Sequence, residues 1–253
     1  RLLSAIKKFR RAALLKEDYV ENHRWLALAL LRYGLHEEAL ANAEAARRLG
    51  PVGWEVHLIV ASCLTRLGRD AEADEAYRRI RLACPGVHKH IEFERGKALL
   101  AAGRYNEACE AFKAVIRADK GYFYARHYLA KAAVGARDYH LAIWALKEDR
   151  MLEGYIINDV YLAGRCAYGL GKYELAEKLF GKAVGEAEKG GWKPQPDWLH
   201  YLGRAQWGLG KRTEALANLE KACDSRKDNV LYARWLFRAY IAADELHKAV
   251  LVC

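Results

Sequence analysis

The sequence predicts an all-α protein built from tandem helix hairpins, and three features of the chain lead to this prediction. Hydrophobic residues make up 53% and charged residues 29% of the 253 positions, which is the composition of a folded chain rather than a disordered one. Only 4 residues are Pro, which favours long helices over a sandwich or barrel. The strongest feature is internal repetition, because alanines recur about every 34 residues, at Ala5, Ala39, Ala73, Ala108, Ala142, Ala176, Ala215 and Ala249.

Residues at fixed distances from these alanines indicate why each repeat is a pair of helices. Five residues earlier, a Gly permits the left-handed turn that ends one helix and starts the next. This Gly is present in five copies, and Arg137 and Asp244 replace it in two. The Ala itself, and small residues such as Gly96, Gly164 and Gly203 in the preceding helix, allow two helices to approach closely. Most copies carry an apolar or aromatic residue four positions after the Ala, among them Tyr77, Phe112 and Phe180.

This pattern resembles the tetratricopeptide repeat. The segments Gly-Arg-Tyr-Asn-Glu-Ala (103–108) and Gly-Lys-Tyr-Glu-Leu-Ala (171–176) match the family motif closely, and the resemblance covers essentially the whole chain. It implies a right-handed superhelical solenoid of helix–turn–helix units. The sequence departs from the family pattern at Arg137, Asp149 and Asp244. Five extra residues within 188–196 are expected to lengthen the second helix of one repeat and the loop after it.

The repeat phase divides the chain into successive elements of a single solenoid, 1–253. Residues 1–16 are expected to be the trailing helix of a truncated repeat, and Leu2, Leu3, Ile6 and Phe9 do not form the polar face of a capping helix. We therefore expect the chain to be part of a larger protein. Six full repeats follow at 20–51, 54–85, 89–120, 123–154, 157–188 and 196–227, and a partial repeat at 230–253.

Charge and cysteine content narrow the expected environment and partners. The net charge is +10, which favours an acidic partner. No apolar run reaches the roughly 18 residues that a membrane span needs. The six cysteines form no CxxC pair and no disulfide framework, so we expect small buried side chains in a cytoplasmic protein. Cys84, His88 and His90 offer only three soft ligands where zinc prefers four, so no metal is predicted.

No segment of the sequence is interpreted as a catalytic motif once its position within the repeat is considered. The segments Gly169-Leu-Gly-Lys172 and Gly208-Leu-Gly-Lys211 resemble phosphate-binding loops, but Tyr173 and Arg212 stand where such a loop needs Ser or Thr. Both segments occupy the turn between the two helices of a repeat. The sequence therefore predicts no enzyme activity and no cofactor for this chain, and leaves the activity of a longer parent protein open.

The candidate binding residues lie on one face of the first helix of each repeat. Counting from the start of each repeat, positions 2, 5, 9 and 12 share a face, because a helix turns about 100° per residue; the resemblance implies that this face lines the concave surface. Five consecutive repeats carry a cation at position 9: Lys97, Lys131, Arg165, Arg204 and Arg238. The other candidates on this face are His127, Tyr161, His200 and Arg234 at position 5, Tyr124 and Asn158 at position 2, and Tyr168 and Trp207 at position 12.

Three functions fit this basic and aromatic face. The first is a non-catalytic protein-interaction scaffold that binds an extended, acidic ligand. The second is a module of a larger bacterial-type enzyme, in glycosyl transfer or polysaccharide assembly, that docks partners or guides an anionic polymer. The third is binding of single-stranded nucleic acid, which combines cations with stacking rings. The carboxylate clamp of chaperone-type relatives is not predicted, because it uses Asn where position 9 has Lys or Arg. His127 and His200 are expected to gain charge as the pH falls toward 6.5.

Overall fold

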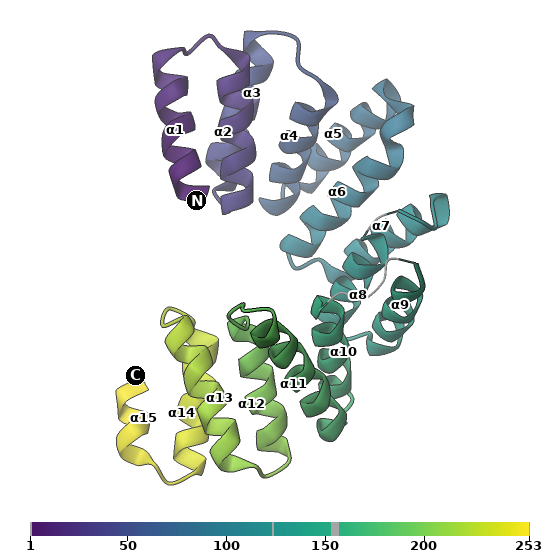
Figure 1. The fold of residues 1–253 in the computed structure, drawn as a ribbon. Helices are drawn as coiled ribbons and strands as arrows, with labels where there is room; N and C mark the ends of the chain where they lie inside the picture. Colours follow the sequence, from purple (N-terminus) through teal and green to yellow (C-terminus); the bar gives the residue numbers. More distant parts are fainter. Residues whose placement is uncertain (1, 123, 153–156, 253) are drawn as a thin grey trace. The chain divides into compact units, whose positions relative to one another are not determined.

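A computed structural model describes residues 2–122, 124–152 and 157–252, and side chains within 2–122, 124–147 and 157–251. Every regular element in these residues is a helix, so the all-α prediction is confirmed (Figure 1). The chain forms two compact units, residues 1–135 and 136–253, and each is considered by itself. Among the described helices, none is long and apolar enough to cross a membrane.

Unit 1 contains eight α-helices within its described residues, and most pack against the next helix in sequence, as Figure 1 shows for α1, α2 and α3. The exception is the pair α5 and α6, which touch only lightly; after a short 3-10 turn η1 (Pro85–Val87), α6 packs on α7 and on α4. The helices are α1 (Leu2–Leu15), α2 (Val20–Tyr33), α3 (His36–Leu49), α4 (Trp54–Arg66), α5 (Asp70–Ala83), α6 (His88–Ala101), α7 (Tyr105–Ala118) and α8 (Ala125–Gly135).

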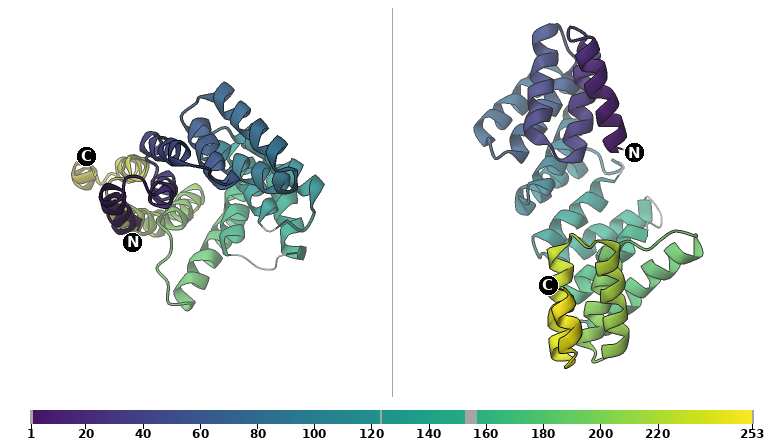
Figure 2. Two further views of the ribbon diagram at one scale, coloured as in Figure 1. Left: turned by 90° about the horizontal axis from the view of Figure 1, so that it is seen from above. Right: turned by 90° about the vertical axis from the view of Figure 1, so that its left-hand side faces the viewer.

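Unit 2 contains seven α-helices within its described residues, stacked in sequence order, and Figure 2 shows α14 and α15 side by side from a second direction. The expected effect of the inserted residues is confirmed, since α11 has 17 residues where α3, α5 and α7 have 14. The helices are α9 (Tyr139–Leu152), α10 (Ile157–Gly169), α11 (Tyr173–Lys189), α12 (Pro196–Gly208), α13 (Arg212–Ser225), α14 (Val230–Ala242) and α15 (Leu246–Val252). The departure at Asp149 lies outside the described side chains.

The core of each hairpin forms where a ring or a leucine packs on a small residue. Tyr77, Phe112, Phe180 and Leu219 follow the repeating alanines by four positions, and each is at most 1% exposed. A Cβ atom added to Gly164 would lie 2.6 Å from Cε1 of Phe180, and one added to Gly96 would lie 2.7 Å from Cε1 of Phe112. The first helix of these hairpins therefore needs Gly at the contact.

The turns between paired helices have the expected left-handed backbone. Gly171 has φ +73°, and Gly34, Gly68, Gly103 and Gly210 also have positive φ. Arg137 and Asp244 both have φ +61°, so the two non-glycine residues adopt the same conformation as the glycines that they replace. A side chain at such a φ carries a steric cost that Gly avoids.

Replacing Gly164 by Ala tests the close helix contact. We expect Gly164→Ala to lower the free energy of unfolding by about 1–3 kcal/mol, because the added methyl group overlaps the Phe180 ring. Gly181→Ala in α11 is the matched control. A Cβ there meets nothing within 4 Å, so the variant should gain about 0.5–1 kcal/mol from helix propensity. Urea unfolding followed by circular dichroism measures both, and equal effects would contradict the packing argument.

Replacing Arg137 by Gly tests the backbone cost at the turn. A non-glycine residue in the left-handed conformation costs about 1–2 kcal/mol, and Gly removes this cost. Gly also increases the conformational entropy of the unfolded chain, which offsets part of the gain. Arg137→Gly should therefore raise the free energy of unfolding by about 0.5–1 kcal/mol. The reverse change at the same repeat position, Gly171→Arg, should lower it. A thermal denaturation series of the two variants against the parent protein checks both signs, and a destabilised Arg137→Gly protein would refute the argument.

Candidate functional site

The sequence-predicted residues fall into two groups, one in each unit. Unit 1 holds Lys97 in α6 and Lys131 and His127 in α8, with Tyr124 just before α8. The remaining nine candidates belong to α10, α12 and α14 of unit 2. Each group belongs to one compact unit.

The cations of unit 1 differ in how they are placed. The Lys97 ammonium lies 2.8 Å from Oε1 of Glu94 and 5.5 Å from the centre of the Phe93 ring. Its charge is therefore already balanced by a carboxylate one helical turn away. Lys131 is exposed, and the His127 ring meets the ring of Tyr128 edge-on at 5.5 Å. The His127 ring also lies 6.1 Å from the ring of Tyr124.

The centre of the unit 2 group is Tyr201, a residue that the analysis of positions 2, 5, 9 and 12 does not select. The guanidinium carbon of Arg165, in α10, lies 4.0 Å from the centre of the Tyr201 ring. The guanidinium carbon of Arg204, in α12, lies 4.8 Å from the same ring. Two predicted cations are thus brought to a single aromatic side chain.

Further rings complete the surroundings of the two arginines. Arg165 donates a hydrogen bond from Nη1 to the Tyr161 hydroxyl at 3.1 Å. Arg204 lies 4.3 Å from the Trp235 ring and 4.8 Å from the Tyr168 ring. We call these residues the aromatic–arginine cluster, and all six are half-buried: Tyr161, Arg165, Tyr168, Tyr201, Arg204 and Trp235.

Four other predicted residues do not join this cluster. Arg234 and Arg238 in α14 and Asn158 in α10 are exposed. The Trp207 ring is covered by a different cation, since the guanidinium of Arg212 lies 3.9 Å above it. Tyr201 and Trp235 both occupy position 6 of their repeats, so an aromatic residue repeated at that position, three residues before the cation, is the signal that would have found them.

The two arginines of the cluster form no ion pair with any side chain that the structure describes. Among the described side chains, no carboxylate lies within 4.0 Å of Arg165 or Arg204, although lysines and arginines elsewhere form many such pairs. The Nε atom of Arg204 is buried and has no hydrogen-bond partner among the described residues. Asp197, at the start of α12, accepts a hydrogen bond from the Tyr232 hydroxyl. Within the part of the chain that the structure describes, the two arginines are therefore held by rings and not by ion pairs.

His200 has a different environment from the one expected of it. Its side chain is only 3% exposed and stacks on Tyr232, with ring centres 4.7 Å apart. Burial, followed by the positive charge of Arg204, lowers the pKa of His200 to about 4, against a smaller opposing effect of Asp197. The prediction that His200 gains charge near pH 6.5 is therefore wrong, because burial penalises the charged imidazole.

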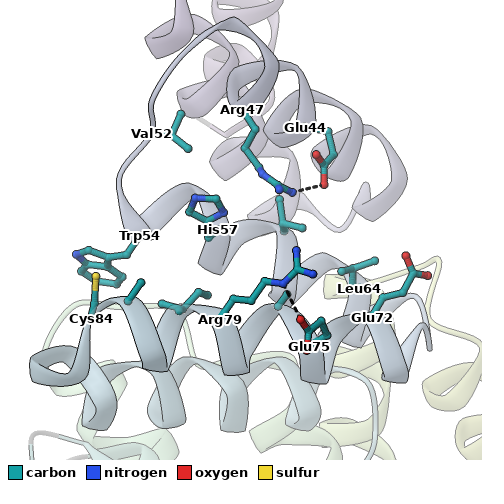
Figure 3. Close-up of a pocket in the computed structure, with 14 residues that line it drawn as sticks. Glu44, Arg47, Val52, Trp54, His57, Leu64, Glu72, Glu75, Arg79 and Cys84 are labelled. Carbon is teal, nitrogen blue, oxygen red and sulfur yellow. Dashed lines mark hydrogen bonds and ion pairs between the residues drawn. The ribbon is translucent and has the colours of Figure 1, made fainter.

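A hollow in unit 1 is lined by none of the predicted residues. It has a volume of about 560 Å³ and lies between α3, α4 and α5, with Trp54 and His57 in its wall (Figure 3). Arg47 and Arg79 reach into it, and each is paired with a glutamate of its own helix, Glu44 or Glu75. A similar hollow of about 510 Å³ lies one repeat earlier, beside His23, so the feature follows from the repeat.

Comparisons with known proteins agree with this fold. Residues 93–122 match the family model described as Tetratricopeptide repeat, and residues 6–83 match the one described as Bacterial transcriptional activator domain. No curated protein matches the sequence significantly.

Solved structures similar to this chain include a tetratricopeptide repeat protein from Parabacteroides merdae, with TM-score 0.69, 16% identity and coverage of 94% of this chain and 92% of that one. Yeast Tom70 matches with TM-score 0.71 and 14% identity over 99% of this chain, which spans 53% of the Tom70 chain. Pseudomonas aeruginosa pilF matches with TM-score 0.58 and 16% identity over 85% of this chain and 96% of its own. The chain is a helical solenoid of tetratricopeptide-type repeats.

The buried neutral His200 predicts a pH-dependent stability. Above pH 6.5 the imidazole is neutral in both states; on acidification the unfolded chain takes up the proton first, because the folded-state pKa is about 4. The free energy of unfolding should therefore fall between pH 6.5 and 4, by up to about 3 kcal/mol, and level off below. Urea unfolding between pH 7.5 and 4 should show a smaller fall for His200→Gln, and identical pH profiles would contradict the assignment.

Proposed function

We propose that this chain is a non-catalytic protein-interaction scaffold whose aromatic–arginine cluster binds acidic side chains of an extended peptide. The observation that carries the proposal is the pair of arginines, Arg165 and Arg204, held on Tyr201 without a carboxylate partner among the described side chains. Elsewhere in the chain, cations such as Arg104 and Lys211 are paired with carboxylates. The positive charge at the cluster is available to a ligand.

The way in which the arginines are held also favours a carboxylate ligand. A guanidinium that lies over a ring has its flat face in contact, while the N–H groups at its edge remain able to donate. Edge-on donation is the geometry of a bidentate arginine–carboxylate pair. Because the rings fix the side chains beforehand, less conformational entropy is lost when the ligand binds.

The same geometry favours the alternative ligands, sugars and nucleic acids, less than a carboxylate. Sugar rings and nucleic-acid bases would need free aromatic faces, but the Tyr201, Tyr168 and Trp235 rings already contact a guanidinium. An anionic polysaccharide or a single strand would therefore depend on its charged groups alone.

We also propose a cytoplasmic location, because the five described cysteines are free thiols in an arrangement without a disulfide framework.

A second candidate function follows from the match of residues 6–83 to a bacterial transcriptional activator domain. Unit 1 would then contribute partner contacts to a regulator of transcription. Fusing residues 1–135, which form one compact unit, to an unrelated DNA-binding domain tests this. Activation of a reporter gene in bacteria would support the role, and a folded fusion without activation would count against it.

Charge removal at the cluster tests the leading proposal. Arg165→Gln with Arg204→Gln should weaken the binding of a fluorescein-labelled acidic peptide at least tenfold, since two charge-assisted contacts of about 1.5 kcal/mol or more are lost. Fluorescence anisotropy at 50 and 200 mM salt provides the measurement, and the affinity of the parent protein should fall with salt.

The matched control is Lys178→Gln with Lys221→Gln. Both lysines are exposed on second helices, α11 and α13, so the net charge changes equally away from the cluster. This control should bind within about twofold of the parent protein, as expected for screened surface charges. Equal losses from both pairs would reduce the site to nonspecific attraction, and an unchanged affinity of the arginine pair would remove the cluster as a binding site.

A further inference from the structure

The spacing of the two arginines limits which acidic ligand can use both. Their guanidinium carbons lie 4.0 Å and 4.8 Å from one ring centre, so they cannot be further apart than the 8.8 Å to which these distances add. Two like charges within this limit repel one another, and no carboxylate among the described side chains lies within ion-pair distance of either. A ligand with two negative groups that lie within about the same limit would relieve this repulsion.

In an extended peptide, two acidic side chains separated by one residue lie within this limit and on the same side of the chain. Residues rise by about 3.3 Å each in an extended chain and alternate sides, so side chains at i and i+2 lie on one side, about 7 Å apart. Side chains at i and i+1 point in opposite directions. Those at i and i+4 are about 13 Å apart, which is further than the 8.8 Å limit on the two guanidinium carbons.

We propose that the aromatic–arginine cluster recognises two acidic side chains separated by one residue in an extended peptide, an Asp-x-Asp or Glu-x-Glu motif. This inference rests on the proposed function and specifies its ligand. Arg165 takes one carboxylate and Arg204 the other, and Tyr201 sets the distance between them. An acidic ligand with the wrong spacing engages only one arginine.

Asp197 lowers the affinity of this site for acidic ligands. It begins the helix that carries Arg204, its carboxylate accepts a hydrogen bond from Tyr232, and it contributes to the electrostatic environment of Arg165. Asp197→Asn keeps a hydrogen-bond acceptor for the Tyr232 hydroxyl while it removes the negative charge. This variant should therefore bind the two-acid peptide several-fold more tightly than the parent protein does.

The test uses labelled peptides in a Pro- and Ser-rich background that does not form helix, and the two peptides that are compared for spacing carry equal charge. Two Asp residues are placed at i,i+2 or at i,i+4, and single-Asp and single-phosphoserine peptides complete the set. By anisotropy, the i,i+2 peptide should bind about tenfold more tightly than the i,i+4 peptide, as expected for one further charge-assisted contact. Arg165→Gln or Arg204→Gln alone should abolish this difference.

Tyr201 provides a second variant that keeps both charges. Tyr201→Leu removes the shared ring and should erase the preference for i,i+2 spacing, while Tyr201→Phe should keep it. Circular dichroism and thermal melting of each variant show whether it is folded.

The outcomes separate the two proposals. If no acidic peptide binds, the proposed function fails. If i,i+2 and i,i+4 peptides bind the parent protein equally, the spacing rule is overturned while the scaffold function stands. Phosphoserine binding as tight as that of the i,i+2 peptide would also overturn the rule, because one compact dianion would then suffice.

Discussion

The fit of a ring against a glycine of the partner helix is the contact on which the arrangement of this protein depends. At Gly96 and Gly164 the ring of Phe112 or Phe180 fills the space that a Cβ would need. Helices that approach this closely tolerate little rotation, because interiors are packed with few voids. Once the glycine faces the partner helix, the direction of every other side chain on the first helix is fixed.

This rotation places the arginines at the margin of the helix contact. Arg165 and Arg204 directly follow Gly164 and Gly203, the residues that face the partner helix, so they lie about 100° around from the packed face. Long side chains at such a margin lie along neighbouring apolar surface and keep their charged ends in contact with water. Rings from α10, α12 and α14 supply that surface.

The two units show why cations at the same repeat position differ in availability. Lys97 in α6 has a glutamate three residues before it, and the two side chains pair. Arg204 in α12 has Tyr201 at the corresponding position, so the preceding turn offers a ring instead of a carboxylate. The flat guanidinium also suits ring contacts better than the compact ammonium of lysine does. The residue at position 6 thus decides whether the cation three residues later is paired: Glu94 pairs with Lys97, whereas Tyr201 offers Arg204 a ring.

The sequence by itself determined the helix hairpins and their phase. The 34-residue recurrence of Ala, the turn glycines and the rings four residues after the Ala act over short distances, so the local pattern is enough to predict them. It also predicted the cations at position 9. Only the tertiary structure decided which of them are paired, that Tyr201 lies between Arg165 and Arg204, and that His200 is buried and neutral. These properties depend on side chains from separate helices meeting in space, and a periodic pattern within one helix carries no information about what the next helix places beside it.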